Sequence, residues 1–143
     1  MNIKQALKLK NKLVTEIKEQ YEIAKAHNSI EQGNTRRYSV NAALTKAGEL
    51  THTLIGLKTK IHKANLPVYH LIFKMSELKN EVKQLKAIPV EEGKVTERYG
   101  SITSIKEVEI NIAQRDNLVK TIEVQIEELQ DQLDVHNNTT ELG

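Results

Sequence analysis

The chain has 143 residues, no cysteine and a formal net charge of +2, so disulfides, thiolate nucleophiles and cysteine-bound metals are excluded, and the charge alone does not indicate nucleic acid. Aromatic residues make up only 3% of the sequence, which indicates an interior filled by aliphatic side chains, as in the seams between helices. No apolar run reaches the roughly 20 residues that cross a bilayer, and the amino terminus lacks the apolar core of a signal peptide. We therefore expect one cytoplasmic domain without a membrane segment.

The first predicted helix covers about residues 2–26. Six apolar positions with helical spacing are expected to face the interior: Ile3, Leu7, Val14, Ile17, Tyr21 and Ala24. Ala6 and Leu13 are expected at the edges of this face. A polar stretch at 27–38 ends the helix, and Ser39 can cap the next one by accepting a hydrogen bond from a backbone amide.

The clearest pattern lies in residues 40–64, where an apolar residue returns at alternating three- and four-residue steps. The positions are Val40, Ala43, Ala47, Leu50, Leu54, Leu57, Ile61 and Ala64. This spacing predicts a helix at about 40–65 with one apolar stripe that packs against another helix. Pro67 disfavours helical geometry in Leu66 and suits the first turn of a new helix, so we expect the chain to turn back at 65–67.

A third helix is expected at about 67–88, before Pro89. Its inward positions follow a seven-residue repeat: Val68, Leu71, Met75, Leu78, Val82 and Leu85. β-Branched residues that alternate loosely predict a short β arm around 95–110. Asn111 can cap a last helix at about 111–136. The expected inner stripe of that helix is Leu118, Val119, Ile122, Ile126, Leu129 and Leu133.

Four helices of this length predict an all-α fold of long antiparallel helices in a single domain, 1–143. Two arrangements remain open: an up-down-up-down four-helix bundle, or two coiled-coil-like helical hairpins that close only on a second copy. Residues 3–25 carry a charge of +3 and residues 112–136 carry −4, which favours helices that lie beside each other or beside those of a partner copy. Solvated faces that merely differ in sign are the alternative.

Several short sequence patterns carry a family resemblance. They are Met1-Asn2-Ile3, the turn at 27–33, Ile61-His62-Lys63-Ala64-Asn65, Arg98-Tyr99 and the ending at 137–142. Taken in this order, they resemble the septicolysin-like family of uncharacterised, mainly bacterial helical proteins. The resemblance implies an all-helical, oligomeric protein and supplies no established function. The chain departs from the family pattern at 74–76, where the family has an Arg-Arg-Asp-like triplet, and at Asn138, where it has a tryptophan.

Arginine stands next to tyrosine in two of the connections between helices, and in an alternating bundle these two connections emerge at the same end. Guanidinium groups bind phosphate through paired hydrogen bonds, tyrosine can stack on a ring, and helix starts offer free amides. Together these groups predict a site for a phosphorylated or nucleotide-like small molecule. The candidate ligand-binding residues are Arg36, Arg37, Tyr38, Lys94, Arg98 and Tyr99. Two solvated loops whose arginines pair with nearby glutamates are the alternative.

Enzyme motifs are missing from the sequence: it has no phosphate loop, dinucleotide fingerprint or nucleophile elbow. The histidines lack the spacing of zinc enzymes, so we expect no metal and no cofactor. Lysines give the first helix a basic edge, but the interleaved aromatics of a nucleic-acid interface are missing, and we do not expect nucleic acid as a partner. The leading hypothesis is a non-catalytic homo-oligomer that binds or sequesters the anionic molecule. The alternative is a structural coiled-coil or adaptor protein that binds a partner protein.

Overall fold

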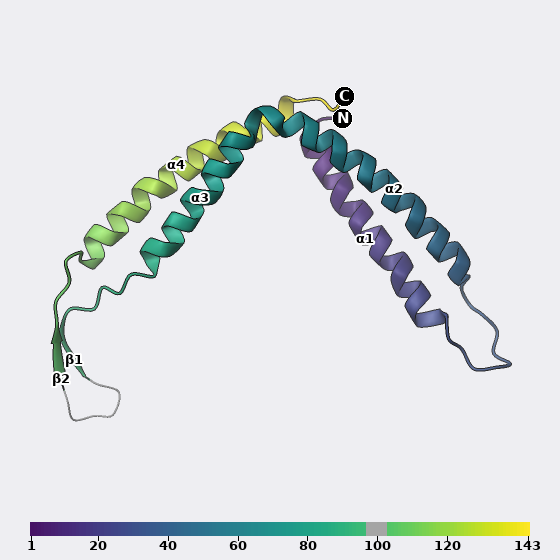
Figure 1. The fold of residues 1–143 in the computed structure, drawn as a ribbon, viewed down its shortest axis with the longest axis horizontal. Coiled ribbons are helices and arrows are strands. Elements are labelled where there is room, and N and C mark those ends of the chain that lie inside the picture. The colour runs from purple at the N-terminus through teal and green to yellow at the C-terminus, as the bar shows by residue number, and fades with distance from the viewer. Residues whose placement is uncertain (97–102) are drawn as a thin grey trace. The chain divides into compact units, whose positions relative to one another are not determined.

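The computed structural model describes residues 1–96 and 103–143. Figure 1 shows the elements in chain order, which are α1 (Ile3–His27), α2 (Val40–Asn65), the 3₁₀ turn η1 (Leu66–Val68), α3 (Tyr69–Lys86), β1 (Gly93–Thr96), β2 (Thr103–Lys106) and α4 (Ile112–Thr139). The chain is mainly helical with a small antiparallel sheet, as the all-α prediction with a short β arm required. The helices expected at about 2–26, 40–65, 67–88 and 111–136 correspond to α1, α2, α3 and α4.

The chain divides into two compact units. Unit 1 comprises Met1–Pro67 together with Val135–Gly143, and unit 2 comprises Val68–Asp134. Each unit contains a pair of helices with its own apolar core. The expectation of one helical domain stays a prediction.

In unit 1, α1 and α2 lie side by side, joined by residues 28–39 (Figure 1). Ala6 and Leu13 of α1 pack with Leu57 and Ile61 of α2 in one buried cluster. Every residue of the apolar stripe predicted for α2 is buried or half-buried. The alternating three- and four-residue spacing therefore identified the buried face of α2 correctly.

The buried face predicted for α1 is partly wrong. Leu13 is 5% exposed, whereas its neighbour Val14 is 48% exposed and Tyr21 also lies at the surface. Ala6, expected at the edge, is fully buried. Small alanines on the buried face allow the two helix backbones to approach closely, and the gain in close packing favours that face over the one with the larger side chains.

The start of α1 and the end of α4 are joined within unit 1. Asn2 and Gln5 form a capping box, in which each side chain accepts a hydrogen bond from the other residue's backbone amide. The amide of Ile3 donates to the carbonyl oxygen of Thr140 at 3.1 Å, and the Asn2 side chain donates to the carbonyl oxygen of Asn138 at 3.2 Å. These contacts hold the last turn of α4, which runs three residues past the end predicted near 136.

The expectation that Pro67 keeps Leu66 out of helical geometry is wrong, whereas the turning back of the chain at 65–67 stays a prediction. Leu66 has helical dihedrals, with φ −48° and ψ −45°, and its amide donates to the carbonyl oxygen of Lys63. The segment is the 3₁₀ turn η1. A proline in a first helical turn sacrifices no intrahelical hydrogen bond, so Pro67 is compatible with this turn. The steric bias that proline places on the residue before it is outweighed here.

In unit 2, α3 and α4 run antiparallel beside each other (Figure 1). Val68 and Met75 pack with Leu129 and Leu133 in a buried cluster. Farther along the pair, the ammonium of Lys86 lies 3.4 Å from the carboxylate of Glu123. The stripe predicted for α3 is buried or half-buried throughout.

The stripe predicted for α4 is correct except for Leu118, which is exposed. Adjacent residues in a helix point about 100° apart, so Leu118 and Val119 do not share the inner face, and Val119 occupies it. At the start of α4, the side chain of Asn111 accepts from the amide of Gln114 at 2.9 Å, while the Gln114 side chain accepts from the Asn111 amide. Asn111 is therefore the cap that the sequence predicted.

The strands β1 and β2 form a two-stranded antiparallel hairpin. Its register pairs Gly93 with Lys106 and Lys94 with Ile105. Gly93 has φ +81°, a conformation that side-chain-bearing residues seldom adopt. The hairpin thus begins at a residue whose backbone geometry requires glycine.

Candidate functional site

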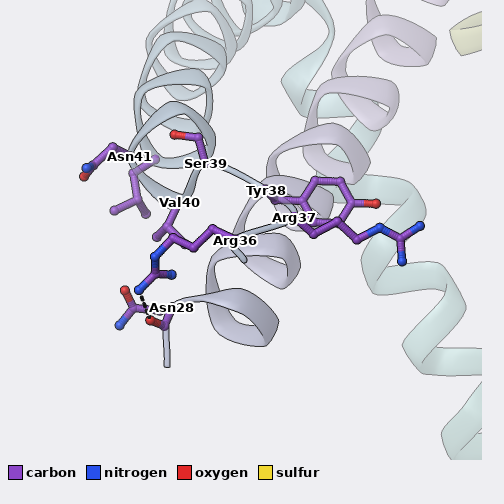
Figure 2. A pocket seen from close by; sticks show the side chains of 8 residues that line it. Asn28, Arg36, Arg37, Tyr38, Ser39, Val40 and Asn41 are labelled. Carbon is purple, nitrogen blue, oxygen red and sulfur yellow. Dashed lines mark hydrogen bonds between the residues drawn. The ribbon is translucent and has the colours of Figure 1, made fainter. Parts of the chain in front are cut away.

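The connection between α1 and α2 folds back onto the end of α1. Nη1 of Arg36 donates to the carbonyl oxygen of His27 at 2.7 Å. Nη2 donates to the carbonyl oxygen of Asn28 at 3.0 Å (Figure 2). Carbonyl groups in the last turn of a helix lack intrahelical partners, and a cation there also opposes the negative end of the helix dipole. Arg36 therefore caps α1 from a position nine residues beyond its end.

The ring of Tyr38 contacts two neighbouring side chains. Its ring centroid lies 4.6 Å from that of His27, with the two planes tilted by 52°. The guanidinium carbon of Arg37 lies 5.7 Å from the centroid of the Tyr38 ring. Such a cation–π contact contributes about 0.5–1 kcal/mol at an exposed site, enough to bias the side chain of Arg37 toward the ring.

The first turn of α2 adds backbone donors to the same region. Ser39 caps the helix, because its Oγ accepts from the amide of Ala42 at 3.1 Å. The amides of Val40 and Asn41 come before the first intrahelical acceptor, so helix geometry leaves them available to another acceptor. The positive end of the helix dipole lies at this turn and favours an anion.

These groups line one surface hollow of about 480 Å³. It is bordered by the end of α1, the connecting segment and the first turns of α2. The lining residues are Asn28, Arg36, Arg37, Tyr38, Ser39, Val40, Asn41 and Leu44. The hollow therefore combines two guanidinium groups, an aromatic ring and a helix amino terminus, and no carboxylate is among its lining residues.

The two guanidinium groups do not converge. Figure 2 shows Arg36 turned toward Asn28, while Arg37 extends past the Tyr38 ring in the other direction. Within residues 1–96 and 103–143, neither arginine takes part in a salt bridge, and Glu91 pairs instead with Lys106 at 3.6 Å. The guanidinium of Arg36 is thus occupied by hydrogen bonds to the carbonyl groups at the end of α1. Arg37 is the cation better able to bind a ligand.

The remaining candidate residues belong to unit 2. Lys94 lies in β1, opposite Ile105. Arg98 and Tyr99 lie outside the described residues. The meeting of the two arginine–tyrosine connections at one site stays a prediction.

Sequence reasoning missed the contribution of His27 and Asn28. His27 contributes its ring to Tyr38, and both residues offer their carbonyl oxygens to Arg36. One signal was available: the polar connection contains Gly33, which has φ +92°, and a turn there brings the arginines back toward the helix that precedes them.

A second hollow, of about 550 Å³, lies elsewhere in unit 1. Its lining is Met1, Leu9, His52, Thr53, Gly56, Leu57, Lys60, Leu142 and Gly143. Lys60 is the one lysine in this lining, which contains no arginine and is mainly apolar. The hollow at Arg37 is therefore the better fit for a phosphate-bearing molecule.

Over the described part of the chain, no group of three or more histidine and acidic side chains is arranged to hold a metal ion. None of the described helices combines the length and apolar character needed to cross a bilayer. No family model, curated protein or solved structure matches the chain. The septicolysin-like resemblance therefore stays a prediction, and function is argued from the residues themselves.

Proposed function

We propose that this protein is a non-catalytic, homo-oligomeric helical protein of the cytoplasm that binds a phosphorylated or nucleotide-like small molecule beside the first turn of α2. The observation that carries the proposal is the hollow that joins Arg37, Tyr38 and the amino terminus of α2. Charge-assisted hydrogen bonds from a guanidinium and from free helix amides are the usual means of holding phosphate.

Each group that lines the hollow has a separate role in binding the ligand. The amides of Val40 and Asn41 meet the phosphate oxygens, and the exposed side chain of Arg37 turns back from the Tyr38 ring to join them. Tyr38, already packed on His27, offers the free part of its ring to a base or sugar. Arg36 holds the connection against α1 and supplies positive charge without leaving its carbonyl partners.

The lining supports binding without turnover. It contains no histidine, carboxylate or cysteine, the side chains that most often exchange protons or attack a substrate near neutral pH. A bound phosphate ester would therefore meet donors and a ring, and no general base. This composition favours holding or sequestering the molecule.

Self-association belongs to the same proposal. Each unit is a helix pair with a core on one side, and two helices alone bury little apolar surface. Large apolar side chains on other faces remain exposed, including Val14 at 48% and Val124 at 47%. Helices from a second copy would cover such faces and complete coiled-coil-like bundles.

A thermal-shift series tests the anion site. The probes are inorganic phosphate, a nucleoside monophosphate, a nucleoside diphosphate and the matching nucleoside without phosphate. We expect the melting temperature to rise with the phosphorylated probes, and the rise to disappear in Arg37→Ala but persist in Lys58→Ala, an exposed control with the same loss of charge. No rise with any phosphorylated probe, or an equal rise in Arg37→Ala, contradicts the site.

The second candidate function is that of a structural coiled-coil or adaptor protein. The exposed Phe73, which stacks on Tyr69 at 5.7 Å between ring centroids, gives α3 an apolar contact point for a partner helix. The absence of any probe effect, together with a stoichiometric protein complex that is lost in Phe73→Ser, would favour this function.

A further inference from the structure

The two units differ strongly in charge. Unit 1 contains twelve Lys and Arg against six Asp and Glu, a formal charge of +6, whereas unit 2 contains nine against thirteen, a formal charge of −4. The net charge of +2 hides this difference. Opposite charge on two surfaces of one chain favours association in which unlike surfaces meet.

The basic charge of unit 1 surrounds a second apolar stripe on α1. Leu7, Val14 and Tyr21 recur every seven residues along the helix; Val14 and Tyr21 are exposed, whereas Leu7 is half-buried at the edge of the stripe, where it packs against the cluster of Ala6 and Leu13. Lys4 and Lys18 lie three or four residues from members of this stripe, so they border it on the helix surface. Both lysines are exposed and form no salt bridge within the described residues. The face therefore has the composition of an apolar seam with a basic rim.

Three of the acidic residues of unit 2 lie together on the outer face of α4. Glu127, Glu128 and Asp131 are exposed and follow Val124 at distances of three, four and seven residues, which puts them around it on one face. Val124 is itself exposed. This face therefore has an exposed apolar side chain with an acidic rim.

We propose that these two faces meet between two copies of the chain: the Leu7–Val14–Tyr21 face of α1 docks on the Val124 face of α4 in a second copy. Two such contacts, related by a two-fold axis, would close a dimer in which each copy supplies both faces. The occupant is a second copy because the chain itself carries both complementary surfaces in equal number. The inference deepens the self-association in the proposed function and makes no use of the anion site.

Charge reversal on each face separately tests the interface. One variant carries Lys4→Glu, Lys8→Glu and Lys18→Glu, which changes the charge of α1 from +3 to −3. The other carries Glu127→Lys, Glu128→Lys and Asp131→Lys, which changes α4 from −4 to +2. A control with Lys74→Glu, Lys79→Glu and Lys83→Glu makes the same change on α3, outside the proposed interface. Circular dichroism checks that each variant keeps its helical content.

Sedimentation equilibrium without ligand should find a wild-type dimer that weakens as salt is raised. Each triple variant should dissociate with a dissociation constant about tenfold higher or more, because like charges then face each other. Mixing the two variants should restore a heterodimer, and placing all six changes in one chain should restore a homodimer. The α3 control should remain dimeric.

Mixing the two triple variants distinguishes the proposed α1–α4 interface from other modes of association. Two variants that stay monomeric when mixed would overturn the proposal, because complementary charge on the two faces would then fail to restore association. A dimer that both triple variants leave unchanged would keep self-association and remove this interface, whereas a wild-type monomer would remove both. A wild-type monomer that binds fluorescent duplex DNA, and loses binding with the α1 variant, would replace the second copy by nucleic acid. None of these results depends on a phosphate probe, so failure here is distinguishable from failure of the anion site.

Discussion

The guanidinium of Arg36 donates a 2.7 Å hydrogen bond to the carbonyl oxygen of His27. Arg36 is the first residue of the arginine–tyrosine segment 36–38, and it also caps the carboxyl end of α1. A similar contact occurs in the second helix pair. There, Nη1 of Arg115, near the start of α4, donates to the carbonyl oxygen of Ile88, just beyond the end of α3, at 3.2 Å. In each unit an arginine reaches back from the following segment to the end of the helix before it. This contact fixes the geometry of the connection between the paired helices.

The first prediction separates the roles of Arg36 and Arg37. Arg36→Ala removes both hydrogen bonds to the α1 carbonyls and should lower the free energy of unfolding by about 1 kcal/mol. Arg37→Ala removes only an exposed cation–π contact, so its effect should be about 0.5 kcal/mol or less. Urea unfolding followed by circular dichroism measures both values. Equal losses in the two variants would contradict the assignment of Arg36 to the helix end.

The second prediction tests which face of α1 is buried. Leu13→Ala should lower the free energy of unfolding by about 2–3 kcal/mol, because Leu13 packs in the cluster with Leu57 and Ile61. Val14→Ala should cost well under half as much, because its side chain is largely in water. The comparison is made at low protein concentration, where association does not contribute. A larger loss for Val14→Ala would restore the face predicted from the sequence.

How far the sequence could predict this fold depended on how many apolar stripes each helix carries. In α2 one stripe satisfies the helical period, and all its members are buried or half-buried. In α1 the residues Ala6 and Leu13 compete with Val14 and Tyr21, and the choice depends on how closely the partner helix approaches. That distance is a property of the packed pair, so the periodicity of α1 alone does not contain it.

The candidate site was predictable in composition and not in geometry. The concentration of arginine and tyrosine at 36–38 is visible in the sequence, and these residues do line a hollow. The direction of each guanidinium depends on competing acceptors, and the carbonyl groups at the end of α1 attract Arg36 more strongly than an empty surface does. Backbone carbonyl groups at the end of a helix therefore compete with a ligand for the arginines of the segment that follows. The sequence alone does not show this competition.

The third prediction concerns the cap of α4. Asn111→Ala removes the acceptor for the Gln114 amide and breaks the reciprocal pair of hydrogen bonds. Loss of such a cap typically costs about 1 kcal/mol. Amide hydrogen exchange should accelerate in the first turn of α4 and change little in α1. The matched control is Asn117→Ala, an exposed interior position of α4 whose side chain caps no helix end. Faster exchange in the control than in Asn111→Ala would argue against the capping role.

The fourth prediction assigns opposite signs to two glycines. Gly48 lies inside α2, and a Cβ placed on it meets no atom within 4 Å, so Gly48→Ala should raise the free energy of unfolding by about 0.5–1 kcal/mol through the better helix propensity of alanine. Gly33 also has open space around it, yet its φ of +92° is strained for alanine, so Gly33→Ala should lower stability by about 1 kcal/mol. Because neither substitution creates a steric clash in the isolated chain, the difference in sign depends on backbone conformation alone. Thermal melts of the two variants decide the matter, and destabilisation by Gly48→Ala would indicate that another surface packs closely against α2 at this position.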